Sequence, residues 1–233
     1  MLNIFLFGST GKMGKCMQSV SDQNDVKIVG NYDRDTDINS ISVQFDCIID
    51  FSSNQCLKQV LQLSKLSNKP IVIASTGHTQ SQLDDIKLHS QTIPILMSAN
   101  MSIGANTLFK LINQATKLLP NFDIEIVETH HNKKHDVPSG TAYKMYNIVS
   151  QSKTAQAIIG RQDGLRQQNE VGIHSIRGGN HIGEHKIIYL GISETLTITH
   201  NAQSREIFAN GACVAAKWLI KQPIGLYNMS DMI

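Results

Sequence analysis

Six titratable side chains fall within seven residues near the middle of the chain: His130, His131, Lys133, Lys134, His135 and Asp136. The segment before them alternates like a strand, with Ile124 and Ile126 on one face. The segment after them, residues 138–142, reads Pro-Ser-Gly-Thr-Ala and opens a helical pattern. A strand end, a polar loop and a capped helix start form a common frame for a reactive site.

Three kinds of chemistry fit this stretch. His131 and His135 could form an i, i+4 pair of metal ligands on a helix, but Pro138 disfavours a helix before it, and the glutamate of the metalloprotease motif is absent. The stretch could also be a solvated basic loop without a function. The interpretation that we favour is an acid–base and anion-binding site, with no metal.

In the favoured interpretation His130 and Lys134 supply protons. The groups expected to hold a substrate carboxylate are the neighbouring polar side chains and the helix start, namely His131, Lys133, Ser139, Gly140 and Thr141. Backbone N–H groups at a helix start bind anions directly. Because adjacent strand residues point to opposite faces, His130 and His131 are expected to have different roles.

A second chemical motif lies near the amino end, where the apolar run of residues 2–7 leads into a glycine-rich turn and then a helical pattern. The candidate cofactor residues of this turn are Gly8, Ser9, Thr10, Gly11, Lys12 and Met13. Gly8 permits the tight turn, Gly11 lets the backbone approach a pyrophosphate, and Gly14 lets the helix pack close to the strand. Because the spacing is GxxGxxG rather than GxGxxG, a turn that merely joins strand to helix is the alternative.

The end of the second predicted strand, residues 26–32, carries Asp33 and Arg34. An acidic residue at this place can bind the ribose hydroxyls of NAD, and an arginine beside it can bind the 2′-phosphate of NADP. The pair therefore suggests that both NADH and NADPH are accepted. A solvated turn is the alternative, since further aspartates follow.

Three more buried strands, residues 45–49, 70–74 and 93–97, alternate with helical patterns. This order predicts a parallel, doubly wound sheet with its ligands beyond the carboxyl ends of the strands. The polar residues expected at those ends include Asp50, Ser75, Thr76 and Asn100. The residues expected to cap the helices that follow are Ser53, Thr79 and Ser102.

The pattern changes after Pro120, where strands are predicted at residues 172–177, 186–190 and 195–199. The fold class is therefore α/β: a Rossmann-like doubly wound parallel sheet plus a second α+β domain with a mixed or antiparallel sheet. We expect residues 1–103 to form a dinucleotide-binding domain, completed by a last helix within about 206–233. Residues 104–205 are expected to form the substrate-binding domain.

Composition restricts the kind of partner. The 233 residues are 41% hydrophobic and 17% charged, which fits a globular protein with a sizeable core. A net charge of +2 without a basic run gives no support for a nucleic-acid or membrane partner. The four scattered cysteines, Cys16, Cys47, Cys56 and Cys213, are expected to be small buried hydrophobes in a reducing cytoplasm.

Together the two motifs indicate a reductase that uses NADH or NADPH on a C=C or C=N bond of a small carboxylated metabolite. The alternatives are another two-domain NAD(P)-dependent dehydrogenase and a nucleotide-sensing binding protein. An acylating dehydrogenase would need a cysteine nucleophile, and Cys47 and Cys56 fall in or near predicted core elements.

Residues 128–142 resemble the signature E-x-H-H-x-x-K-x-D-A-P-S-G-T-A of the 4-hydroxy-tetrahydrodipicolinate reductase (dihydrodipicolinate reductase) family of bacterial lysine and diaminopimelate synthesis. The resemblance runs nearly end to end. Its supporting matches lie at residues 8–14, 50–52, 75–77, 99–104, 177–179, 183–185 and 208–212.

The resemblance implies roles for individual residues. His130 and Lys134 match the catalytic proton donor–acceptor pair, and His131, Gly140 and Thr141 match the carboxylate contacts. The nicotinamide-side loops match Ala74, Ser75, Thr76, Ser98, Ala99, Asn100 and Met101. The implied reaction removes water from a hydroxylated tetrahydrodipicolinate, a dicarboxylate, and adds hydride to ring position 4. The implied assembly is a homotetramer built through the sheet of the second domain.

Overall fold

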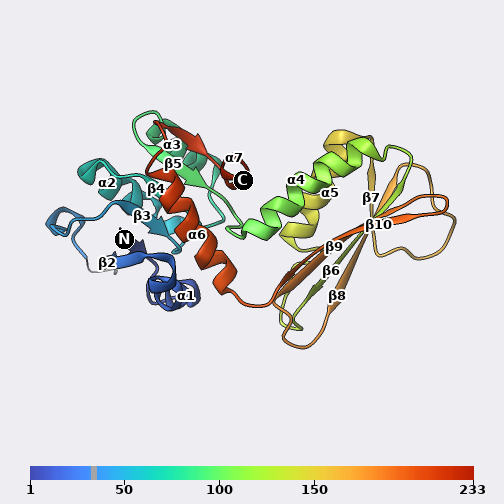
Figure 1. Cartoon of the computed structure of the whole chain (residues 1–233), viewed down its shortest axis with the longest axis horizontal. Helices are drawn as coiled ribbons and strands as arrows, with labels where there is room; N and C mark the ends of the chain where they lie inside the picture. Colours follow the sequence, from blue (N-terminus) through green and yellow to red (C-terminus); the bar gives the residue numbers. More distant parts are fainter. Residues whose placement is uncertain (33–35) are drawn as a thin grey trace. The chain divides into compact units, whose positions relative to one another are not determined.

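The computed structural model describes residues 1–32 and 36–233, which form two compact units (Figure 1). Unit 1 contains Met1–Ile103 and Arg205–Ile233, and unit 2 contains Gly104–Ser204. Each unit has its own sheet and its own hydrophobic core.

Unit 1 is built on a six-stranded sheet whose strand pairs are all parallel. In spatial order its strands are β11 (Gly225–Tyr227), β5 (Pro94–Met97), β4 (Ile71–Ile73), β3 (Cys47–Asp50), β1 (Leu2–Phe7) and β2 (Val26–Tyr32). The predicted doubly wound parallel sheet is therefore confirmed. The sequence patterns missed β11, which has only three residues and no fully buried side chain.

Helices cover both faces of this sheet because its strands are apolar on both sides. On one face Ile4 and Leu6 pack with α1 (Lys12–Val20) and α6 (Glu206–Leu219). On the other face Phe5 and Phe7 pack in a second cluster, to which the helices α2 (Leu57–Ser67) and α3 (Gln80–His89) contribute. The remaining short helical segments of unit 1 are η1 (Asp22–Asn24), η2 (Ile38–Ser40), η3 (Asn54–Cys56) and α7 (Met229–Met232).

Two predicted helix caps can be compared with the structure. The Thr79 side chain accepts the Gln82 N–H at 3.3 Å, and the Gln82 side chain accepts the Thr79 N–H at 2.9 Å, so the predicted cap is part of a capping box. The predicted cap at Ser53 was wrong. Ser53 precedes the short η3 turn without a side-chain cap hydrogen bond, and α2 begins only at Leu57.

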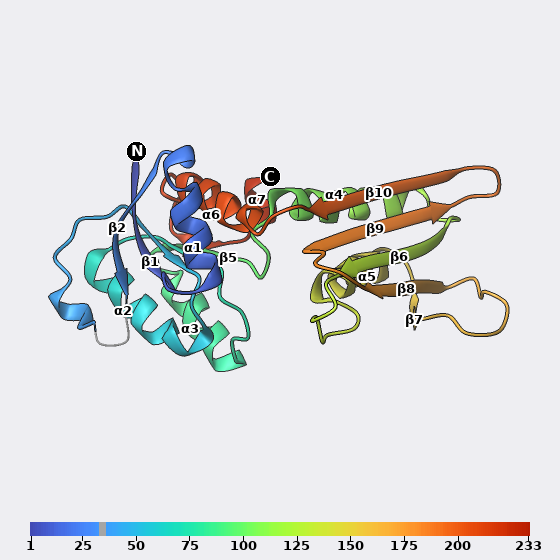
Figure 2. The same ribbon diagram turned by 90° about the horizontal axis from the view of Figure 1, so that it is seen from below.

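Unit 2 contains a five-stranded mixed sheet, as predicted. In spatial order its strands are β10 (Thr195–Ala202), β9 (Gly183–Leu190), β6 (Asp123–His130), β8 (Glu170–Arg177) and β7 (Gln156–Ile159). β6 is parallel to β8 and antiparallel to β9 (Figure 2). The sequence patterns missed β7, a four-residue edge strand without a buried residue.

Two helices, α4 (Ile103–Leu118) and α5 (Gly140–Ser152), pack on one face of this sheet. Burial along β6 alternates at every residue, so the face that buries Ile124 and Ile126 also buries Glu128 and His130. The apolar face of the central strand thus ends in two titratable side chains. In the described part of the chain, no helix is long and apolar enough to cross a bilayer.

Candidate active site

The centre of the candidate site is the carboxylate of Glu128, which is fully buried on β6. Its two oxygens accept a fork of hydrogen bonds from Arg177, at 2.7 Å from Nη2 and 2.9 Å from Nη1. One oxygen also pairs with Nδ1 of His130, and the other accepts the backbone N–H of Ser139 at 3.2 Å. A single carboxylate therefore joins the strand end, the neighbouring strand β8 and the start of α5.

Strand register explains why these groups meet. β8 is paired with β6 so that Arg177 stands opposite His130, and β9 places His185 opposite Glu128. The His185 ring meets the His130 ring edge-on, with centroids 5.0 Å apart. Its Nε2 atom lies 3.2 Å from Oγ of Ser139. The titratable side chains of β6 therefore contact side chains from both neighbouring strands, Arg177 of β8 and His185 of β9.

Burial and neighbouring charges shift the pKa values of Glu128 and His185. Burial alone would raise the pKa of Glu128, but the hydrogen bonds from His130 and Arg177 outweigh burial and hold the Glu128 pKa well below its ordinary range. Burial, together with the nearby His130, lowers the pKa of His185 to about 3. At neutral pH Glu128 is therefore a carboxylate and His185 a neutral ring.

The loop between β6 and α5 carries the other candidate residues. The ammonium of Lys134 lies 2.8 Å from Oδ1 of Asp136, and that contact is the main cause of the lowered pKa of Asp136. The backbone carbonyl of Asp136 accepts a hydrogen bond from Arg177 at 2.8 Å, so the loop is tied to the same arginine as Glu128. The Lys134–Asp136 ion pair and the Arg177 hydrogen bond therefore fix this loop within unit 2.

The remaining predicted substrate residues lie in this loop and at the following helix start. His131 is half-buried, and its backbone N–H donates to the His181 carbonyl at 2.7 Å. Lys133 is exposed. Ser139 is the N-cap of α5, and its side chain accepts the Ala142 N–H at 3.2 Å. Gly140 is exposed and Thr141 half-buried in the first turn of α5, and the Gly140 N–H donates to the Asp136 carboxylate.

The helical metal pair that we considered for His131 and His135 does not form. Both residues lie in the loop between β6 and α5, where no helix is present. Among the described residues, no group of three or more His, Cys, Asp or Glu side chains could hold a metal ion.

The glycine turn of unit 1 has the geometry expected of a dinucleotide loop. Gly8 has φ +84°, and a Cβ at Gly14 would lie 2.3 Å from the Gly8 carbonyl oxygen, so both glycines are required by the turn itself. Gly11 is different, because a Cβ there would meet only that oxygen, at 3.4 Å. Gly11 is also the N-cap of α1 and provides no side-chain cap, so the first turn of α1 suits a phosphate group.

The other residues of this loop differ in exposure. Thr10 and Lys12 are exposed, Met13 is half-buried, and Ser9 is buried. The exposed positions surround the amino end of α1. The amino end of α1 is therefore accessible at Thr10, Gly11 and Lys12, whereas the Ser9 side chain is not.

The loops at the carboxyl ends of β3 and β4 are joined by a buried carboxylate. Asp50 accepts hydrogen bonds from the hydroxyls of Ser52 and Ser75, and burial raises the Asp50 pKa. The Ser75 hydroxyl also lies 3.2 Å from Nε2 of His78. Ser75 is thus a residue that fixes its loop, while the adjacent Thr76 is exposed and Ala74 is half-buried.

The loop after β5 has a similar organisation. The Ser98 hydroxyl donates to the Asn100 carbonyl at 2.9 Å, and the Asn100 side chain accepts the Ser102 N–H at 2.9 Å. Met101 is buried in the core, so only its backbone can face a ligand, whereas Ala99 is exposed. The predicted ribose and 2′-phosphate residues, Asp33 and Arg34, lie outside the described residues.

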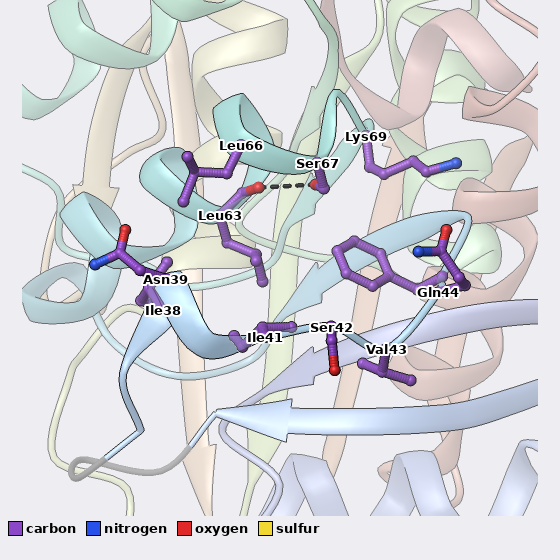
Figure 3. Close-up of a pocket in the computed structure, with 11 residues that line it drawn as sticks. Ile38, Asn39, Ile41, Ser42, Val43, Gln44, Leu63, Leu66, Ser67 and Lys69 are labelled. Atoms are coloured by element: carbon purple, nitrogen blue, oxygen red, sulfur yellow. Dashed lines mark hydrogen bonds between the residues drawn. The ribbon is translucent and has the colours of Figure 1, made fainter.

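A hollow of about 460 Å³ in unit 1 lies apart from these loops (Figure 3). It is lined by residues 38–45 and by α2 with its following turn, including Asn39, Gln44 and Lys69. Figure 3 shows the Ser67 hydroxyl hydrogen-bonded to the Leu63 carbonyl at its wall. None of the predicted site residues that the structure describes lines it, so we assign it no role in the chemistry.

Comparison with known proteins gives a consistent result for both halves of the chain. The family model described as "Dihydrodipicolinate reductase, N-terminus" matches residues 2–101, and the model described as "Dihydrodipicolinate reductase, C-terminus" matches residues 104–233. The chain belongs to the dihydrodipicolinate reductase family.

Relatives within the dihydrodipicolinate reductase family match over their whole length. A 4-hydroxy-tetrahydrodipicolinate reductase of Caldanaerobacter subterraneus is 39% identical over 100% of this chain and 98% of its own. Another, from Rickettsia bellii, is 41% identical over 99% of this chain and 94% of its own. The fold matches a solved dipicolinate-bound dihydrodipicolinate reductase from Paenisporosarcina, with a TM-score of 0.84, 22% identity and 100% coverage of both chains.

Three residues of this candidate site were not among the predicted site residues: Glu128, Arg177 and His185. The alternation that placed Ile124 and Ile126 on the buried face would also have placed Glu128 there. No sequence pattern indicated that Arg177 and His185 belong to the site, because only the strand register brings them to β6.

Proposed function

We propose that this protein is a 4-hydroxy-tetrahydrodipicolinate reductase that uses NADPH or NADH. The observation that carries the proposal is the buried network of Glu128, His130 and Arg177 beside Lys134 and the start of α5, in a chain that matches the family over both halves. No packing requirement explains so many titratable groups at the end of one strand.

The proposed reaction combines loss of water with addition of a hydride and a proton. The hydroxylated tetrahydrodipicolinate loses its hydroxyl group and a ring proton as water, which leaves a conjugated C=N and C=C system. A bound nicotinamide would supply hydride to ring position 4. The ring then takes up one proton, so that each turnover consumes one reduced nicotinamide and one proton and releases one water molecule.

The chain's own residues provide proton transfer and an anion site. His130 and Lys134 exchange protons with the ring, which suits groups held at a strand end next to a helix start. The residues that bind the two substrate carboxylates are His131, Lys133, Ser139, Gly140 and Thr141. Lys134, which pairs with Asp136 in the structure, would turn to the substrate when it binds.

The cofactor residues are proposed for unit 1. Gly8, Ser9, Thr10, Gly11, Lys12 and Met13 would hold the pyrophosphate. The nicotinamide end would lie against Ala74, Ser75, Thr76, Ser98, Ala99, Asn100 and Met101. Asp33 beside Arg34 supports the use of both NADH and NADPH, because one binds ribose hydroxyls and the other a 2′-phosphate.

We further propose a cytoplasmic homotetramer that forms through the sheet of unit 2. The face of this sheet opposite α4 and α5 carries apolar side chains, among them Val127, Ile176 and Ile188, and Ile176 is 51% exposed. An exposed apolar face of this kind is typical of a subunit interface. Sedimentation as a monomer at micromolar concentration would refute this part of the proposal.

The activity is tested by following oxidation of NADPH and of NADH with substrate generated in the cuvette. The preceding synthase forms this substrate in the cuvette from pyruvate and aspartate semialdehyde. We expect rapid oxidation that depends on both synthase substrates. The ratio of the two kcat/KM values then gives the cofactor preference, and binding of NADH without any oxidation would contradict the proposal.

A further inference from the structure

The imidazole of His130 has two nitrogens in different surroundings. Nδ1 is paired with the buried Glu128 carboxylate, and the ring is only 7% exposed. Among the residues that the structure describes, Nε2 has no hydrogen-bond partner. Nε2 faces Gly183, whose missing side chain leaves room beside that nitrogen.

The Glu128 carboxylate is itself fixed at four points. Arg177 binds both of its oxygens, Ser139 donates its backbone N–H to one, and His130 pairs with the other. A carboxylate held this way cannot rotate without breaking hydrogen bonds in a buried site. The same group therefore determines the orientation of the His130 ring and the place where α5 begins.

We propose that Glu128 is a positioning residue for proton transfer, which holds His130 by Nδ1 so that Nε2 is the nitrogen that exchanges the proton with substrate. In the proposed reaction the Nε2–H bond breaks and a C–H bond forms on the reduced ring. His130 then remains as a neutral ring with its proton on Nδ1, and Nε2 regains a proton from water. A carboxylate that receives Nδ1–H both orients the ring and stabilises its charged form. This role rests on the proposed function.

The same strand contains a matched control. Glu125 lies three residues earlier on the opposite face of β6, and it also pairs with one arginine and one histidine, Arg166 and His174. The two carboxylates thus have the same kinds of partner in the same strand. Only Glu128 contacts a candidate catalytic group.

The first experiment compares Glu128→Gln with Glu125→Gln in the full-length protein. We expect Glu128→Gln to lower kcat by about 10–100-fold, the range for losing a residue that orients a functional group, with smaller changes in KM for NADPH. Glu125→Gln should stay within about twofold of the wild-type kcat, because a partly exposed ion pair contributes little. Equal losses in both variants would overturn the proposal.

A second variant separates orientation from charge balance. Glu128→Gln alone leaves the Arg177 guanidinium without its carboxylate, which could destabilise the sheet. The double variant Glu128→Gln/Arg177→Met removes both charges. We expect it to regain thermal stability without regaining kcat. Recovery of wild-type kcat in the double variant would show that Glu128 only balances Arg177, and the proposal would be wrong.

The pH profile adds a readout that a purely structural role would not change. The charged and titratable groups around His130 are Glu128 on its own strand, Arg177 on β8, His185 on β9 and Lys134 in the loop, with His200 on β10 beside His185. Glu128→Gln removes the negative charge next to the proton-exchanging groups, and a negative charge favours the protonated form of its neighbours. The alkaline limb of the kcat/KM profile should therefore move to lower pH by about one unit in Glu128→Gln. An unmoved limb would contradict the proposal.

Long-range proton–nitrogen spectra of the histidine rings test the tautomer without any turnover. We expect the neutral His130 ring to carry its proton on Nδ1 in the wild type, and to lose that preference in Glu128→Gln. A wild-type ring protonated on Nε2 would overturn the proposal even if the enzyme is active. An inactive protein with the expected tautomer would instead contradict the proposed function, so the two failures are distinguishable.

Discussion

Gly183 faces the Nε2 edge of the His130 ring: a Cβ built on Gly183 would lie 3.0 Å from Nε2 and 3.3 Å from Cδ2 of that ring. Gly183 begins β9, and it is buried. The absence of a side chain at this position keeps open the side of His130 that is opposite Glu128. The structure therefore has a fixed nitrogen and an open nitrogen on the same ring.

The position of Gly183 beside the His130 ring gives the first prediction. Gly183→Ala should lower kcat by about 10-fold or more, because a methyl group would displace the ring from its position or obstruct Nε2. Binding of NADPH, measured by fluorescence titration, should be unchanged. The control is Gly178→Ala, where a Cβ would have no neighbour within 4 Å. A Gly183→Ala enzyme with wild-type kcat would show that Nε2 is not the reacting edge.

Lys134 gives the second prediction. Lys134→Ala should lower kcat by about 10²–10⁴-fold, the range expected for removing a general acid, while NADH binding remains intact. Lys186→Ala is a suitable control, because Lys186 lies on β9 and pairs only with Glu184, at 3.7 Å, in the described part of the chain. Unchanged turnover in Lys134→Ala would exclude the assigned role.

The glycine turn of unit 1 gives a third prediction from two similar substitutions. Gly14→Ala places a Cβ 2.3 Å from the Gly8 carbonyl and should cost about 1–3 kcal/mol or more of stability, as overpacking does. Gly11→Ala has room in the folded chain and should leave the thermal midpoint nearly unchanged. It should weaken NADPH binding at least 10-fold, because the methyl group would occupy the place proposed for the pyrophosphate. Tight NADPH binding by Gly11→Ala would place the pyrophosphate elsewhere.

The buried ring of His185 makes stability depend on pH. An ordinary histidine in the unfolded chain takes up a proton near pH 6.5, whereas the pKa of His185 in the folded chain is lowered to about 3. Between these values the unfolded state binds more protons, so stability falls as the pH decreases from 6.5 towards 3. The contribution of one such group is at most about 1.4 kcal/mol per pH unit.

Urea unfolding at pH 7 and pH 5 measures this effect. The wild type should lose more stability between the two pH values than His185→Gln does. His89 and His200 also have lowered pKa values, so the variant should keep part of the dependence. Identical losses in the two proteins would show that His185 does not stay neutral in the folded state.

Sequence patterns predicted the parts of the fold in which the chain itself carries the periodicity. The apolar strands and the glycine turn predicted the parallel sheet of unit 1. The cap at Thr79 predicted the start of α3, and the helical pattern after Pro138 predicted the start of α5. Short edge strands were missed, since β7 and β11 bury no residue completely. Ser53 was misplaced because a 3₁₀ turn intervenes before α2.

The candidate site also has one part that the sequence predicted and one part that only the structure revealed. His130, Lys134 and the start of α5 are close together in sequence, so a local pattern was sufficient to predict them. The contact between Glu128 and Arg177 joins residues 49 positions apart. It depends on the register of β6 against β8, which has no local signature in either strand. The role of a carboxylate that holds a histidine could therefore be inferred only from the structure.

The most direct test of the central claim follows the hydrogen itself. NADPH carrying deuterium in both positions at C4 of the nicotinamide is mixed with the enzyme and with substrate formed from pyruvate and aspartate semialdehyde. We predict a product that contains one deuterium atom at ring position 4, found by mass spectrometry and NMR, with no label in the solvent. Oxidation of the cofactor without label in the product, or label at another carbon, would contradict the assigned reduction.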